Sequence, residues 1–148
     1  ATVSTLTDSL LAQLDFEQLT EKQKTIGRQL IGSIDEDGYM RRDLEAVVND
    51  LAFSQNVEAT PDEVERVLFT IQTFDPPGIG ARELQECLLL QLDRKDHDNP
   101  AVTLAIRIID DFFEEFTKKH YEKIQKRLDV SDGEMKEAIR LITRLNHK

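Results

Sequence analysis

The residues that most often carry metal or redox chemistry are scattered in this sequence. Its three histidines, His97, His120 and His147, lie more than twenty residues apart, and none has a second His or a Cys at the spacing of a zinc site. The single Cys87 cannot form an intrachain disulfide. Because it lies in the apolar run 84–92, we expect a small core residue in a reducing compartment.

Two acidic pairs, Asp110-Asp111 and Glu114-Glu115, are spaced like half of a carboxylate-bridged metal site. Such sites also place a Glu three residues before a His, whereas Thr117 stands three residues before His120. The pairs therefore indicate an exposed acidic helix face, and we expect no metal site.

Two further segments resemble ligand-binding loops but lack residues that such loops need to bind their ligands. Asp35-Glu36-Asp37-Gly38 has the composition of a calcium loop, but the position of the bidentate Glu is taken by Leu44. Gly78-Ile79-Gly80 lacks the Lys-Ser/Thr pair of a phosphate-binding loop. No pattern pairs a nucleophile with a base. We expect no catalytic residue, no cofactor and no small-molecule substrate, so the chain is predicted not to be an enzyme.

The composition is that of a globular protein with an uneven charge. Of the 148 residues 39% are hydrophobic and 32% charged, and no apolar run is long enough to cross a membrane. The net charge of -10 argues against DNA or RNA binding by the chain alone. Residues 117–148 nevertheless carry nine Lys or Arg against five Asp or Glu. The acidic body and this basic end could be two partner surfaces of opposite charge. The same counts also fit a solvated helix face.

Apolar residues recur at spacings of three and four, and strict alternation is absent, so the fold class is predicted to be all-α. About eight helices are expected. They cover or centre on residues 4–16, 21–34, 44–51, 61–71, 81–93, 102–116, 121–128 and 134–145.

Helix starts are marked by capping patterns. Thr60-Pro61-Asp62-Glu63 combines a capping hydroxyl, a proline at the first helical position and a Glu three residues after the cap. Ser131 with Glu134, and Thr5 with Asp8, have the same spacing, and a helix is expected to follow Thr20. These signals predict where helices begin.

Proline and glycine in the segment 74–82 predict a connector between two small helical lobes, residues 1–75 and residues 76–148. The polar stretch 94–100 is a second candidate linker. The last two helices are joined by a short turn and fit either a helix-turn-helix-like pair or an ordinary helical hairpin.

Two segments are more specific than any pattern above. They are Ile34-Asp35-Glu36-Asp37-Gly38-Tyr39-Met40 and the longer run from Ile71 to Leu92, which contains Phe74-Asp75-Pro76-Pro77-Gly78-Ile79-Gly80-Ala81-Arg82. Both, and the two helices predicted between them, resemble the core-binding domain of bacterial sigma-54 factors, the nitrogen-type alternative sigma class. The similarity of helix order extends over essentially the whole chain.

The resemblance implies a role in transcription initiation, in which this domain docks on core RNA polymerase in the cytoplasm. In that family, flanking regions respond to an ATP-driven activator and recognise promoter DNA. Neither a Gln- and Leu-rich activator region nor an Arg-rich promoter-reading box is found in this sequence. The chain is therefore expected to be an excised central domain that contacts promoter DNA weakly or only through those flanks, and no membrane.

Candidate site residues fall into two groups. The first is expected to contact the partner and consists of Arg41, Arg42, Lys118, Lys119, Lys123, Lys126 and Arg127. The second is expected to have a structural role in the family motifs and consists of Asp35, Asp37, Gly38, Tyr39, Asp75, Pro76, Pro77, Gly78, Gly80 and Arg82. For Arg82 we expect a carboxylate partner, either Asp75 or one in the other lobe, because a cation is poorly placed at a helix start.

Two other functions remain open. The basic terminal helices could hold DNA directly, with the last helix entering a groove, although the net charge weighs against this. The periodicity alone would also fit a helical adaptor unrelated to transcription, and the two motif segments favour the sigma-factor reading over it.

Overall fold

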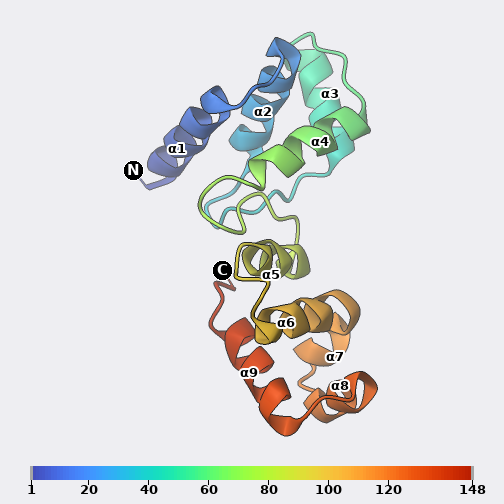
Figure 1. Ribbon diagram of the computed structural model, residues 1–148. Helices are drawn as coiled ribbons and strands as arrows, with labels where there is room; N and C mark the ends of the chain where they lie inside the picture. Colours follow the sequence, from blue (N-terminus) through green and yellow to red (C-terminus); the bar gives the residue numbers. More distant parts are fainter. Residues whose placement is uncertain (1, 148) are drawn as a thin grey trace. The chain divides into compact units, whose positions relative to one another are not determined.

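A computed structural model describes residues 2–147 of the chain. Over this range the structure consists of α-helices and contains no strand apart from an isolated antiparallel bridge between Ile34 and Met40, which confirms the all-α prediction (Figure 1). The helices are α1 (Thr2–Phe16), α2 (Glu21–Ser33), α3 (Leu44–Ser54), α4 (Pro61–Ile71), α5 (Leu84–Asp93), α6 (Pro100–Asp111), α7 (Phe113–Thr117), α8 (Tyr121–Leu128) and α9 (Asp132–Thr143).

The described residues form nine helices instead of eight because the expected helix over 102–116 is broken at Phe112. This residue leaves the helical conformation, with φ -131° and ψ 31°. Main-chain hydrogen bonds continue on both sides of it, from the Phe112 amide to the Ile108 carbonyl (2.8 Å) and from the Phe116 amide to the Phe112 carbonyl (2.9 Å). No Pro or Gly stands at the break, so the sequence pattern did not indicate it.

Capping boxes begin three of the helices. Two were predicted, at Thr60 with Glu63 and at Ser131 with Glu134, and a third joins Thr20 to Gln23. The box predicted at Thr5 is wrong, because α1 begins at Thr2 and Thr5 lies inside it. Reciprocal side-chain caps satisfy amide groups that the first helical turn leaves without partners.

The chain divides into two compact units, the first ending at Glu83 and the second beginning at Leu84. The boundary expected at residue 75 differs from this position because Phe74, Ile79 and Ala81 are buried, and the first two belong to the core of the first unit. The Pro-Gly segment is therefore part of the first unit. For the same reason α5 begins at Leu84, not at residue 81 as predicted.

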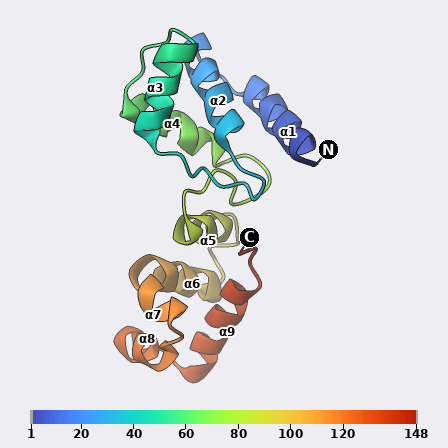
Figure 2. The same ribbon diagram turned by 180° about the vertical axis from the view of Figure 1, so that it is seen from behind.

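In the first unit, α2 lies between α1 and the α3–α4 pair (Figures 1 and 2). Its buried stripe includes Ile26 and Leu30, which belong to the same core as Leu10 and Leu14 of α1. Gly27 allows the two helices to approach closely, because a Cβ atom at this position would lie 2.7 Å from a methyl carbon of Leu14. Burial of this apolar stripe stabilises the unit.

In the second unit, α6 packs against α5, α7 and α9. Its core combines Leu88 and Leu92 of α5 with residues of α6 and α9. The Gln91 side chain accepts a hydrogen bond from the Asn146 amide (2.8 Å) and donates one to the Asn146 carbonyl (2.7 Å), so the residue after α9 is held against α5. None of the described helices is both long and apolar enough to span a bilayer.

Gly80 lies close to the side chains of α4 and of Gln72 at its end. Its φ of +77° lies in the left-handed region, which residues with a Cβ rarely adopt. A Cβ atom here would lie 3.3 Å from Cγ of Gln72 and 3.5 Å from a methyl carbon of Leu68. Both conditions favour glycine.

We predict that Gly80→Ala lowers the free energy of unfolding by about 1–2 kcal/mol, because the variant must adopt a strained φ beside buried side chains. The matched control is Gly32→Ala, whose Cβ would meet no atom within 4 Å in α2. Alanine is the better helix former, so this variant should gain up to about 1 kcal/mol. Urea unfolding followed by circular dichroism measures both, and equal effects of the two substitutions would contradict the prediction.

Candidate functional site

The first sequence motif forms a tight turn around the carboxylate of Asp35. One carboxylate oxygen accepts hydrogen bonds from the amides of Asp37 (2.9 Å) and Tyr39 (3.0 Å), and the other accepts from Nε of Arg41 (2.9 Å). The Gly38 amide donates to the Asp35 carbonyl (2.9 Å), and Gly38 has a φ of 89°. The Asp35 carboxylate is thus satisfied by protein donors.

These contacts decide the ionisation of Asp35. Burial raises the pKa of Asp35, but the Tyr39 amide, the Arg41 guanidinium and the Asp37 amide together outweigh it and hold the pKa below its ordinary value. The side chain of Arg41 also lies over the ring of Tyr39, with its guanidinium carbon 4.4 Å from the ring centre. The ionised turn is therefore the stable form at neutral pH.

The two sequence motifs are joined by main-chain hydrogen bonds. The Gly80 amide donates to the Gly38 carbonyl (2.8 Å), and the Met40 amide donates to the Ala81 carbonyl (2.9 Å). The buried side chain of Gln72 donates to the Gly80 carbonyl (3.0 Å). Segments about forty residues apart in the sequence thus form one framework in the first unit.

The proline-containing part of this framework is held by α1. The Gln13 side chain accepts a hydrogen bond from the Asp75 amide (2.8 Å) and donates one to the Asp75 carbonyl (3.0 Å). The Asp75–Pro76 peptide bond is cis, and the Ile79 amide donates to the Pro76 carbonyl (3.0 Å). Pro77 leads into Gly78, whose φ is 93°. The segment is therefore held by α1 at Asp75 and by the first motif at Gly80.

Arg82 ends the framework with an ion pair to α4. Its Nη1 lies 2.9 Å from a carboxylate oxygen of Glu65 in α4, and its guanidinium lies 5.7 Å from the ring centre of Phe69. About a third of each charged side chain is exposed, so the pair is only modestly stabilising. The sequence predicted a carboxylate partner for Arg82, either Asp75 or one in the other lobe, and Glu65 lies in the predicted lobe 1–75 and fits the second alternative.

The two arginines expected to contact a partner have carboxylate neighbours of their own. Arg41 pairs with Asp35, and Nη2 of Arg42 lies 2.6 Å from a carboxylate oxygen of Asp50 in α3. About half or more of each arginine side chain remains exposed, so both can still meet another surface.

The basic residues expected in the second half of the chain gather on α8 and the turn before it. All five are exposed: Lys118, Lys119, Lys123, Lys126 and Arg127. We call them the α8 basic strip. A hydrogen bond with Glu114 (2.9 Å) raises the pKa of Lys118, and the same contact lowers the pKa of Glu114. Carboxylates therefore neutralise part of the strip, which belongs to a different unit from Arg41 and Arg42.

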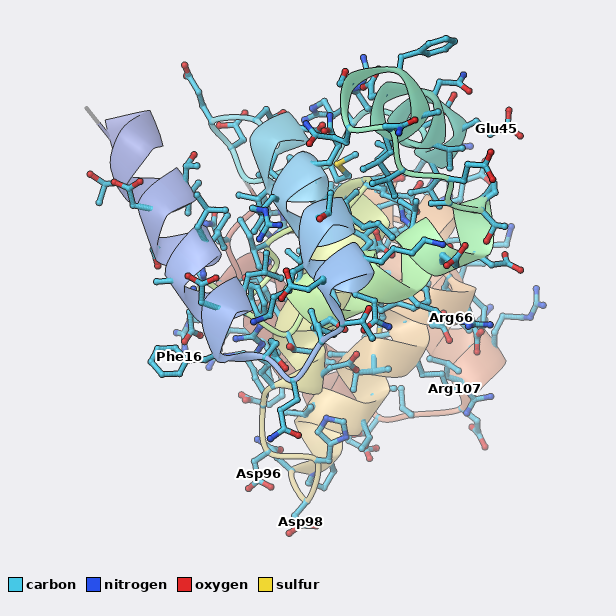
Figure 3. All side chains as sticks on the ribbon, turned by 90° about the horizontal axis from the view of Figure 1, so that it is seen from above. Phe16, Glu45, Arg66, Asp96, Asp98 and Arg107 are labelled. Atoms are coloured by element: carbon cyan, nitrogen blue, oxygen red, sulfur yellow. The ribbon has the colours of Figure 1, made fainter. Side chains whose placement is uncertain are left out.

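Two nearly fully exposed aromatic side chains were missed in the sequence. Phe16 at the end of α1 is 91% exposed and Phe53 in α3 is 89% exposed. Figure 3 shows the Phe16 ring pointing away from the helices. Both residues lie off the apolar stripes of their helices, and this departure from helical spacing is the signal that could have identified them.

Among the described residues, no group of three or more His, Cys, Asp or Glu side chains is placed to hold a metal ion. Exposed Phe and Arg side chains are the residue types that contribute most to protein interfaces.

We predict that Asp35→Asn lowers the free energy of unfolding by about 1 kcal/mol at pH 7, because the half-exposed turn loses its charge-assisted hydrogen bonds. Since folding depresses the pKa of Asp35, its contribution is complete above the unfolded value of roughly 3.9 and is lost as the pH falls through the lower folded value. The difference between variant and wild type should therefore shrink below about pH 4.

Asp37→Asn is the control, since it removes a charge from the same turn and the Asp37 carboxylate makes no hydrogen bond among the described residues. Urea unfolding at pH 7 and at acidic pH measures both variants. A stability difference for Asp35→Asn that does not change with pH would argue against the role of its charge.

The family described as "Sigma-54 factor, core binding domain" matches residues 1–148. Among curated proteins, the RNA polymerase sigma-54 factor of Xanthomonas euvesicatoria is 38% identical over 142 residues, which is 96% of this chain and 29% of that protein. Its counterpart from Azorhizobium caulinodans is 40% identical over 149 residues, covering 100% of this chain and 27% of that protein. The Escherichia coli (strain K12) protein is 31% identical over 145 residues, or 98% and 30%.

The chain spans less than a third of the length of these relatives. The match includes both motifs of the braced framework, and it covers the whole sequence. The resemblance seen in the motifs is thereby confirmed, and the chain belongs to the family of sigma-54 factor core-binding domains.

Proposed function

We propose that this chain binds core RNA polymerase in transcription initiation, as the polymerase-binding part of a sigma-54 factor. The observation that carries the proposal is the family match over residues 1–148, whose description names core binding. The relatives are named RNA polymerase sigma-54 factors, and this chain corresponds to less than a third of each. Response to an activator and reading of the promoter are assigned to other regions of such factors.

The proposal makes the chain a binding protein without a reaction of its own. It acts where bacterial RNA polymerase acts, in the cytoplasm. Its partner is a large protein, so the contacts that matter are exposed aromatic and arginine side chains, which contribute most to the affinity of protein interfaces. In the first unit these are Phe16, Phe53, Arg41 and Arg42.

We assign the motif residues to the framework that holds this surface. The residues are Asp35, Asp37, Gly38, Tyr39, Asp75, Pro76, Pro77, Gly78, Gly80 and Arg82. Support comes from the contacts within the unit, since Gly38 and Gly80 are bonded to each other and Arg82 is paired with Glu65. Tyr39 is 4% exposed and has almost no surface to offer a partner.

We predict that the wild-type chain forms a complex with purified core polymerase from the bacterium that encodes it. The double variant Phe16→Ser/Phe53→Ser should bind about thirtyfold more weakly, because two interface aromatics at on the order of 1 kcal/mol each amount to roughly 2 kcal/mol. Biolayer interferometry with immobilised polymerase gives both dissociation constants.

The control is Asn49→Ser, an exposed polar position of α3 in the same unit, which should leave the affinity unchanged. Thermal unfolding checks that each variant is folded. No complex between the folded wild-type chain and polymerase at micromolar concentrations would refute the proposed function. An unchanged affinity of the Phe double variant would remove only the assignment of the aromatic contacts.

The α8 basic strip supports a second candidate, direct contact with DNA. Lysines on one exposed helix are suited to phosphate groups. The following helix, α9, is less suited to enter a groove, because its first turn carries Asp132 and Glu134 and would face the phosphates with negative charge. We therefore propose that the strip lies near promoter DNA only when a complete transcription complex has assembled.

We predict that Lys123→Glu/Lys126→Glu, placed in a complete sigma-54 factor, shortens the lifetime of the promoter complex several-fold, because two attractive charges become repulsive. Filter binding after addition of competitor DNA measures the lifetime. Lys136→Glu on α9 is the control. The wild-type chain alone should bind duplex DNA weakly, with an affinity that falls steeply with salt. An unchanged lifetime for the double variant would exclude this role of the strip.

A further inference from the structure

The second unit contains a groove of about 890 Å³ between α6 and α9. Its apolar surface comes from Leu104 of α6, Leu141 of α9 and the nearby Leu145 and Val130, all of which are only partly buried. These side chains pack against the core of the unit on one side and line the groove on the other. The groove therefore offers apolar contact area that the unit itself does not use.

Cationic side chains surround this apolar surface. Lys95, Arg107, Arg140 and Arg144 line the groove, against two carboxylates, Glu134 and Glu137 (Arg107 is labelled in Figure 3). The charged side chains that line the groove therefore carry a net positive charge, although the whole chain carries a net charge of -10.

The two carboxylates are engaged by α9 and its capping residue, whereas no carboxylate among the described residues pairs with Lys95 or Arg144. Glu134 accepts a hydrogen bond from the Ser131 amide (2.9 Å), which lowers its pKa, and Glu137 pairs with Arg140 (3.3 Å). Neither Lys95 nor Arg144 forms an ion pair among residues 2–147. An occupant with carboxylates would meet free positive charge at these two positions.

We propose that this groove binds an amphipathic segment of core RNA polymerase that carries aliphatic or aromatic side chains flanked by Asp or Glu. The inference rests on the proposed function and adds the site and the chemistry of one contact. Apolar side chains of the segment cover Leu104, Leu141 and Leu145, and its carboxylates face Lys95 and Arg144. This is the helix-in-groove mode of peptide recognition with charges at the rim.

A nucleic acid fits the same groove less well. Its phosphates would satisfy the cations, but they would leave the leucines exposed to water and would face Glu134 and Glu137. A protein segment matches both the apolar surface and the charge. The acidic first unit of a second copy of this chain could also occupy the groove. The experiment must distinguish it from a polymerase segment.

The test uses a photoactivatable amino acid at Thr103, an exposed position on the α6 wall of the groove, in the chain bound to core polymerase. The control carries the same group at Lys136, which is exposed on α9 and does not line the groove. Duplex DNA is present in the mixture. We expect the Thr103 product alone to contain a polymerase peptide with apolar residues and an excess of Asp and Glu, identified by mass spectrometry.

Affinity gives an independent measure. Arg144→Glu should weaken binding to core polymerase roughly fivefold, with the loss reduced at high salt, whereas Lys136→Glu should change it less than about twofold. Thermal unfolding of both variants confirms that they are folded.

The outcomes separate the inference from the proposed function. If the wild-type chain binds polymerase but Thr103 cross-links to DNA, to a second copy or to nothing, the groove assignment is overturned and the proposed function stands. Equal affinities of Arg144→Glu and wild type overturn it as well. If the wild-type chain does not bind polymerase, the proposed function fails and the inference fails with it.

Discussion

The first unit depends on a pair of main-chain hydrogen bonds between two turns. Gly38 and Met40 in one turn are bonded to Gly80 and Ala81 in the other. Hydrogen bonds between main-chain groups require close approach, and glycine at positive φ permits it at both turns. The helices contribute the apolar core, but these bonds fix where the chain crosses from α2 to α3 and from α4 to α5. The surface carrying Arg41 and Arg42 follows directly from this arrangement.

Local signals in the sequence predicted much of the fold. Apolar spacing identified the helices, and capping boxes located the starts of α4 and α9, because both effects involve residues within one or two helical turns. The break at Phe112 could not be predicted in this way, since no helix-breaking residue marks it. The boundary between the two compact units differs from the predicted one for a related reason. Pro and Gly mark an irregular segment, but only the tertiary core decides that Phe74 and Ile79 are buried with the first unit.

The site was predicted in part. The motif residues were recognised by their types and spacing, whereas their partners, such as Glu65 for Arg82 and Gln13 for Asp75, come from helices distant in the sequence. The exposed Phe16 and Phe53 were not recognised, because helical spacing identifies only the apolar residues that lie on the buried stripe of a helix. The α6–α9 groove is invisible to local patterns, since its two walls lie about thirty residues apart.

Two glutamine side chains hydrogen-bond in the same way to the main chain of residues distant in the sequence. Gln13 bonds to Asp75, and Gln91 bonds to Asn146. Each amide side chain both donates to and accepts from one residue, as a neighbouring strand would. The paired residues are separated by 62 and 55 positions, so each contact closes a loop over most of its unit. Closing so long a loop is entropically costly, and each pair of hydrogen bonds offsets part of that cost. Each glutamine therefore fastens the last part of a unit to the first helix of that unit, α1 in one case and α5 in the other.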